Sequence, residues 1–139
     1  FQSSTVAGEK QSQIYLYNYV HYDMLYRYRH AVNISRTDRY RVFNDGGNPD
    51  LFSETDRTGT GKIFLRLYKV TKEHGSSYDA WVRMGAPERM NRMERAMLCH
   101  SADPECRVWE QETGPEGSLT VQERLEPHET ALIEVEQIL

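Results

Sequence analysis

Long apolar runs are missing from this sequence. No stretch approaches the ~20 consecutive apolar residues that a membrane-spanning helix needs, and none resembles the hydrophobic region of a secretory signal. We therefore expect no membrane contact. The chain begins at Phe1 rather than at a methionine, so we expect its natural N-terminus to lie upstream.

Cysteine is also scarce, with only Cys99 and Cys106 present. Two cysteines do not make a disulfide scaffold, although a single bridge closing this short loop stays open in an oxidising compartment. His100 and Asp103 lie nearby in sequence, but a second Cys-x-x-Cys or a pair of histidines is missing, so we expect no metal site. We expect no other cofactor.

Positive charge is not in excess either. The net charge of -4 argues against a general nucleic-acid-binding protein. Charge is unevenly distributed, and the pattern predicts two solvated faces. The early arginines are Arg27, Arg29, Arg36, Arg39 and Arg41, and the late glutamates are Glu110, Glu112, Glu116, Glu123, Glu126, Glu129, Glu134 and Glu136.

Aromatic residues, in contrast, are plentiful. Nine tyrosines, four phenylalanines and two tryptophans in 139 residues indicate a folded chain rather than a disordered one. This length fits one domain. Residues 1–11 are polar and small and predict a flexible lead-in, so we place the domain at residues 12–139.

Strand patterns dominate that domain. Residues 13–20 are rich in β-branched and aromatic residues and are apolar on both faces, which is typical of a strand covered on both sides. Residues 62–71 predict a further strand, in which Ile63, Leu65 and Leu67 oppose Phe64, Tyr68 and Val70. We expect the tyrosine side of 13–20 to meet a local helix, another domain or a ligand. Tyr40–Phe43 predicts a further short strand, and 21–36 an irregular loop or short helix.

The C-terminal third also predicts strands. Residues 107–112, 118–125 and 130–139 follow strand patterns, and the last two alternate apolar with polar residues as in a half-buried antiparallel hairpin. A turn is expected at Pro127-His128.

Two short helices are expected between these strands. Ser76, Asp79 and Gly85 can cap and close a helix over residues 76–85. Pro87 predicts the start of a second helix reaching about Leu98, whose stripe of Met90, Met93 and Met97 predicts core packing. The expected fold class is mainly β, an antiparallel β-sandwich-like domain with one or two short helices.

Three segments resemble family 39 glycoside hydrolases of the β-xylosidase type. Residues 16–23 (LYNYVHYD) look like the strand and turn that follow the catalytic barrel in that family. Residues 74–87 (HGSSYDAWVRMGAP) are similar to the family's motif ending in Met-Gly-x-Pro, and residues 125–135 (LEPHETALIEV) resemble its last hairpin. The resemblance covers residues 12–138. It departs from the family at residues 89–104, where the family usually has a Thr- or Glu-rich helix with a leucine and this chain has methionines and the Cys99–Cys106 loop.

The resemblance implies a parent enzyme that hydrolyses β-xylosides with retention, through a (β/α)₈ barrel and two glutamates. A barrel needs about 250 residues, and the Asn-Glu pair that carries the family's acid/base glutamate is absent, so no catalytic residue is transferred. The chain is therefore expected to be the family's non-catalytic C-terminal accessory domain, whose partner is the missing barrel. The resemblance favours a bacterial cytoplasm. It also allows a parent fused to an AraC-type transcriptional regulator, in which this domain would serve as an interaction or sensory domain.

One set of residues is the candidate contact surface. Its aromatic members can pack against the barrel, or stack on the sugar rings of a xylo-oligosaccharide as in a carbohydrate-binding module. Its polar members are expected to satisfy loop backbone groups, and self-association through the set would give a homo-oligomer. The set is Tyr15, Tyr17, Tyr19, His21, Tyr22, Asp23, His74, Tyr78, Asp79 and Trp81.

Overall fold

Strands make up most of the computed structural model, which describes residues 2–7, 11–19, 48–57 and 59–137. Two described helices, α3 (Ser77–Arg83) and α4 (Arg92–Ser101), separate the fourth strand from the fifth. The mainly β fold with short helices is confirmed. The strands are β1 (Gln2–Ala7), β2 (Gln11–Tyr17), β3 (Asp50–Arg57), β4 (Lys62–Val70), β5 (Glu105–Glu112), β6 (Ser118–Leu125) and β7 (Thr130–Gln137).

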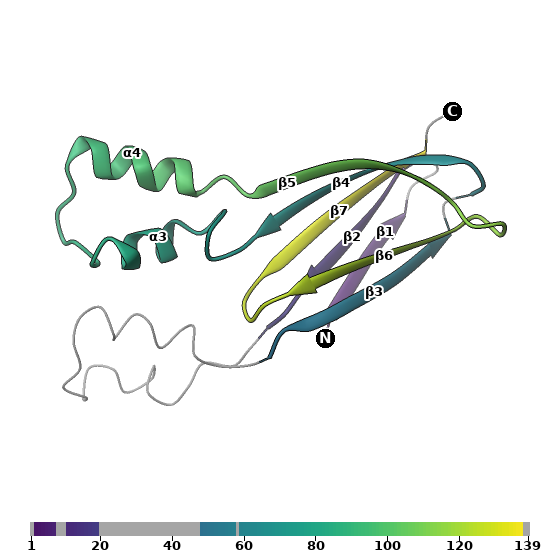
Figure 1. Ribbon diagram of the computed structural model, residues 1–139, viewed down its shortest axis with the longest axis horizontal. Helices are drawn as coiled ribbons and strands as arrows, with labels where there is room; N and C mark the ends of the chain where they lie inside the picture. Colours follow the sequence, from purple (N-terminus) through teal and green to yellow (C-terminus); the bar gives the residue numbers. More distant parts are fainter. Residues whose placement is uncertain (1, 8–10, 20–47, 58, 138–139) are drawn as a thin grey trace.

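The strands form two antiparallel sheets. The larger sheet has the order β1-β2-β7-β4-β5, and the smaller one pairs β3 with β6. Figure 1 shows the smaller sheet lying along one face of the larger, while α3 and α4 lie beyond one end of the strands. This sandwich-like arrangement agrees with the expected fold class. The last strand, β7, occupies the centre of the larger sheet.

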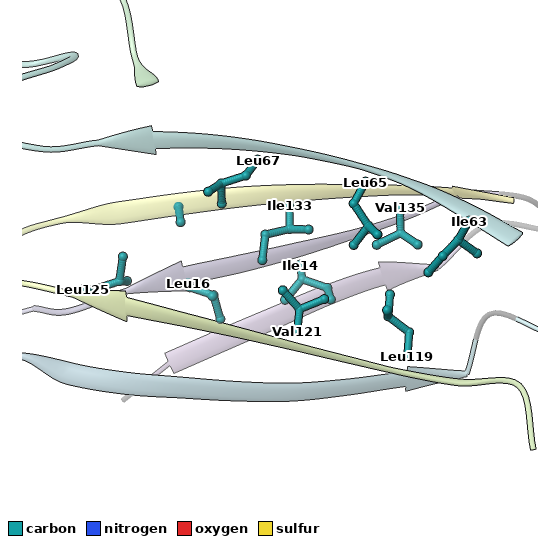
Figure 2. Close-up of a cluster of buried hydrophobic side chains, with 11 residues drawn as sticks. Ile14, Leu16, Ile63, Leu65, Leu67, Leu119, Val121, Leu125, Ile133 and Val135 are labelled. Atoms are coloured by element: carbon teal, nitrogen blue, oxygen red, sulfur yellow. The ribbon is translucent and has the colours of Figure 1, made fainter. Parts of the chain in front are cut away.

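Alternation along the strands explains the core. In β4, Ile63, Leu65 and Leu67 are fully buried while the residues between them are partly exposed. β2 and β7 repeat this pattern, and β6 supplies the opposing apolar residues. Figure 2 shows these side chains meeting between the sheets. Because each fully buried aliphatic side chain contributes about 1.5–3 kcal/mol, this layer is the main stabilising element of the fold.

The expected terminal hairpin is wrong. β6 pairs with β3, whereas β7 pairs with β2 and β4, so these consecutive strands belong to different sheets. The predicted turn is present, with His128 at φ 68° and its N–H donating to the Asn18 carbonyl at 2.8 Å. It carries the chain from one sheet to the other. Alternation identifies a buried face but does not identify the neighbouring strand, which is why the pairing was misassigned.

The prediction of a flexible lead-in over residues 1–11 is also wrong for residues 2–7. Residues 2–7 form β1, which pairs with β2 from Gln2 opposite Tyr17 to Ala7 opposite Ser12. The sequence patterns did not predict β3. Both strands are rich in polar residues and have no clear apolar alternation. The strand expected at 40–43 and the loop expected at 21–36 lie outside the described residues.

α3 forms as the capping residues predict. The Ser76 side chain accepts from the Asp79 N–H at 3.2 Å, and Gly85 follows the helix at φ 89°, in the left-handed region that favours glycine. Asp79 thus lies in the first turn, as expected.

α4 differs from its prediction. It begins after Asn91, where a capping box with Glu94 satisfies both backbone N–H groups, rather than at Pro87. The methionine stripe is not core, since Met93 is 74% and Met97 59% exposed and Met90 precedes the helix. The helix pair extends past the sheets, so the described residues provide no core for the methionines to enter.

Candidate functional site

The outer face of the five-stranded sheet carries three of the predicted contact residues. Tyr15, Tyr17 and Tyr19 alternate with the buried Ile14, Leu16 and Asn18, so all three tyrosines lie on the side away from the core. Tyr15 is 48% and Tyr19 61% exposed. Among the described elements no helix lies over this face (Figure 1).

Neighbouring strands extend the tyrosines into an apolar surface, which we call the tyrosine face: Tyr15, Tyr17, Tyr68, Val70 and Leu132. The register places Tyr15 opposite Leu132 and Leu132 opposite Tyr68, and it places Tyr17 and Val70 on either side of Thr130. Sequence reasoning did not include Tyr68 or Leu132, although their alternation with buried neighbours was a usable signal. The tyrosine face thus groups apolar side chains from three neighbouring strands, with Thr130 between Tyr17 and Val70.

The other half of the same face is mainly polar, and its aromatic residue Phe64 lies beneath the Arg66 guanidinium, 5.9 Å from ring centroid to guanidinium carbon. Glu134 accepts from Gln13 Nε2 at 3.3 Å and pairs with Arg66 at 3.3 Å, and these side chains line a shallow hollow. Hydrogen bonding to Tyr68 is the main cause that raises the pKa of Arg66 above its ordinary value, and Glu134 adds to it. Arg66 therefore stays charged at the border between the polar half and the tyrosine face.

A second group of predicted residues belongs to α3. The rings of Tyr78 and Trp81 lie 6.1 Å apart on one side of the helix, as their spacing predicts. Trp81 Nε1 donates to the Pro87 carbonyl at 3.0 Å, which ties the helix to the segment that follows it. His74 lies exposed in the turn before α3, where its N–H donates to Thr71 Oγ1 at 3.0 Å. His21, Tyr22 and Asp23 lie outside the described residues.

Two glutamates lie near each other, Glu123 on β6 and Glu129 directly before β7. Glu123 and Glu129 both contact Lys69 Nζ, at 3.1 and 3.4 Å. Glu123 also pairs with Arg107, and Glu129 accepts from the Glu126 N–H at 3.0 Å. Glu129 lines a small hollow in which Glu123 takes no part. Because both carboxylates are already held by cations or amides, we interpret the cluster as a link between the two sheets rather than as an acid and nucleophile pair.

The described residues give no support to a metal centre or a membrane span. Among them, no group of three or more His, Cys, Asp or Glu side chains is placed to hold a metal ion. Cys99 and Cys106 are both exposed free thiols. Neither α3 nor α4 is long and apolar enough to cross a membrane.

Comparison with solved structures identifies the fold. The chain superimposes on the GH39 enzyme of Xanthomonas axonopodis pv. citri with a TM-score of 0.69 at 13% identity, covering 98% of this chain and 26% of that one. A monomeric β-xylosidase from Caulobacter crescentus gives 0.68 at 17% identity, covering 99% and 26%. The chain has the fold of about a quarter of a GH39 enzyme.

A further GH39 β-xylosidase structure from Caulobacter crescentus agrees, with a TM-score of 0.56 at 17% identity and coverage of 98% and 23%. No protein-family model and no curated protein matches the sequence. The GH39-type fold accounts for nearly the whole of this chain, while about three quarters of each GH39 enzyme has no counterpart in it.

Proposed function

We propose that this chain is a non-catalytic accessory domain that packs, through the tyrosine face, against a larger catalytic domain of the GH39 type. The observation that carries the proposal is the unequal coverage, 98% of this chain against 26% of the GH39 enzyme. The segments that resemble family 39 glycoside hydrolases support the same assignment. The catalytic domain would then be a (β/α)₈ barrel that acts on β-xylosides.

The tyrosine face has the properties of a surface that a protein partner covers. It combines the exposed ring of Tyr15 and the partly exposed rings of Tyr17 and Tyr68 with aliphatic side chains, and Arg66 and Glu134 lie at the other half of the same face. Contact surfaces are enriched in tyrosine and depleted in charge at their centre. A barrel seated there would bury Tyr15 and Leu132 and leave Arg66 and Glu134 at the rim.

The first test is catalytic. We expect the chain alone to leave an aryl β-xyloside intact, because its described carboxylate pair is neutralised by Lys69 and Arg107. Release of the chromophore is followed by absorbance, with the Caulobacter β-xylosidase as the positive control. Turnover that disappears in Glu123→Gln or Glu129→Gln would contradict the proposal.

A titration with xylo-oligosaccharide tests the alternative of a carbohydrate-binding module. It should leave tryptophan fluorescence unchanged, and a saturable change lost in Trp81→Ala would favour a carbohydrate-binding module instead.

A second test concerns the tyrosine face itself. Native protein is expected to enhance the fluorescence of the apolar dye anilinonaphthalene sulfonate, and Tyr15→Lys combined with Leu132→Lys should lower that enhancement by roughly half. Gln13→Lys is the matched control, since it adds a lysine to the polar half of the same strand. Equal dye binding by all three proteins, at unchanged thermal stability, would show that the tyrosine face is not the exposed apolar surface.

A further inference from the structure

The solvent side of α4 carries three side chains that can donate electrons to a metal ion. Met93, Met97 and His100 follow the spacing i, i+4, i+7, which places them in one row along the helix. Met93 is 74% and Met97 59% exposed, and the side chain of His100 is 92% exposed. Packing against the rest of the domain therefore does not explain this row.

The geometry of a helix allows the three donors to converge. Side chains four residues apart have Cβ atoms about 5–6 Å from each other. Long helical side chains also lean toward the N-terminus, which directs His100 toward Met97 and Met97 toward Met93. Ala96 lies three residues after Met93 and four before His100, so only a methyl group occupies the remaining corner of this face. Two sulfur atoms and one imidazole nitrogen can thus reach a single small ion.

The imidazole of His100 has a carboxylate beside one of its two nitrogens. Nδ1 lies 3.7 Å from Oδ2 of Asp103, which follows the helix C-cap. A histidine that binds a metal usually directs its other ring nitrogen toward a carboxylate, a carbonyl or water. The position of Asp103 accordingly leaves Nε2 of His100 for the ion.

We propose that Met93, Met97 and His100 form a surface site for cuprous copper, Cu(I). Thioether sulfur is a soft ligand that favours Cu(I), and imidazole also binds copper. The absence of a suitable group of three His, Cys, Asp or Glu side chains among the described residues does not bear on this site, because its main donors are methionines. The site lies on α4, outside the tyrosine face, and does not depend on the proposed accessory role.

A protein contact explains the row less well. A specific interface covers about 800 Å² on each partner, and two methionines with one alanine supply only a small part of that area. The apolar side chains are also bordered by charge, since Arg92, Glu94 and Arg95 belong to the same helix.

Titration of the full chain with Ag(I) tests the proposal. Ag(I) has the charge and the filled d shell of Cu(I), and it is not oxidised in air. Cys99→Ser combined with Cys106→Ser provides the background protein, because both exposed thiols would bind the probe themselves. With the methionine methyl groups labelled with carbon-13, NMR should show two of the five methionine signals, those of Met93 and Met97, shifting as the first equivalent is added.

Substitutions in the same background measure the affinity, by competition with a chromogenic chelator. Met97→Leu keeps the size and the helix propensity of the side chain but removes the central sulfur. Loss of a group that merely supports a metal ligand costs about 10–100-fold in affinity, so loss of this ligand should cost at least about tenfold. Met84→Leu is the matched control, since it removes a thioether at the end of α3 and should bind Ag(I) like the background protein.

Three results would overturn the proposal. The first is that Ag(I) shifts all five methionine signals alike, or none of them. The second is equal affinity of Met97→Leu and Met84→Leu at unchanged thermal stability. The third is a chain that binds Ag(I) at this row but shows no shift of the Met93 and Met97 signals with Cu(I) under nitrogen.

Discussion

Replacement of Lys69 by methionine is expected to lower the free energy of unfolding by about 3–5 kcal/mol. The side chains of Lys69, Glu123 and Glu129 are only 14%, 13% and 10% exposed. Without the ammonium group, Glu129 loses its cation and Glu123 keeps only Arg107. Two largely buried carboxylates then lack part of the positive charge that balances them. Lys69 Nζ also donates to the Arg124 carbonyl at 2.7 Å, and that bond is lost as well.

Urea denaturation followed by circular dichroism measures this loss, and Lys62→Met is the matched control. Lys62 lies on the same strand and pairs with Glu110, but both side chains are about half exposed. Hydrogen bonding to Glu110 raises the pKa of Lys62, yet water screens the pair, so its removal should leave the denaturation midpoint nearly unchanged. Equal midpoints for the two variants would show that the Lys69 cluster does not hold the sheets together.

Adjacent residues of β7 should respond very differently to truncation. Ile133→Ala is expected to cost about 2–5 kcal/mol, because Ile133 is fully buried at the centre of the core and leaves a cavity. Leu132→Ala should cost a small fraction of this, since Leu132 belongs to the partly exposed tyrosine face. Thermal and urea unfolding of both variants measures the difference.

The comparison also tests the register of the sheet. A shift of one residue in β7 would exchange the two faces of the strand. If Leu132→Ala proved the more damaging change, the assignment of β7 and of the tyrosine face would both be wrong. Thr130→Ala serves as a control, since it truncates a residue on the same side as Leu132 at the end of the strand.

Much of the fold could be predicted from the sequence because a half-buried strand alternates apolar with polar residues. The alternation in residues 62–71 and 130–137 predicts β4 and β7, and the capping residues around Ser76 predict α3. β1 and β3 were not predicted, since strands rich in polar residues show no clear alternation of apolar and polar residues. Which strands become neighbours depends on contacts between residues far apart in sequence. A local pattern therefore could not show that β6 and β7 pair with other strands rather than with each other.

The candidate site was predictable in part for the same reason. The tyrosines of β2 stood out because a strand that is apolar on both sides needs a cover on both. Tyr68 and Leu132 join them only through the register with β7, and the Lys69 cluster assembles three strands. The methionines of α4 have helical periodicity, but periodicity alone does not tell whether the stripe meets a core or solvent.

The central position of β7 has a consequence for synthesis of the chain. β7 lies between β2 and β4, so the two halves of the larger sheet are joined through the described strand that leaves the ribosome last. Until then, no described strand connects β1 and β2 to β4 and β5 by hydrogen bonds. Since such distant pairings form slowly, the nascent chain exposes the unpaired edges of β2 and β4, and the larger sheet can be completed only after β7 has left the ribosome.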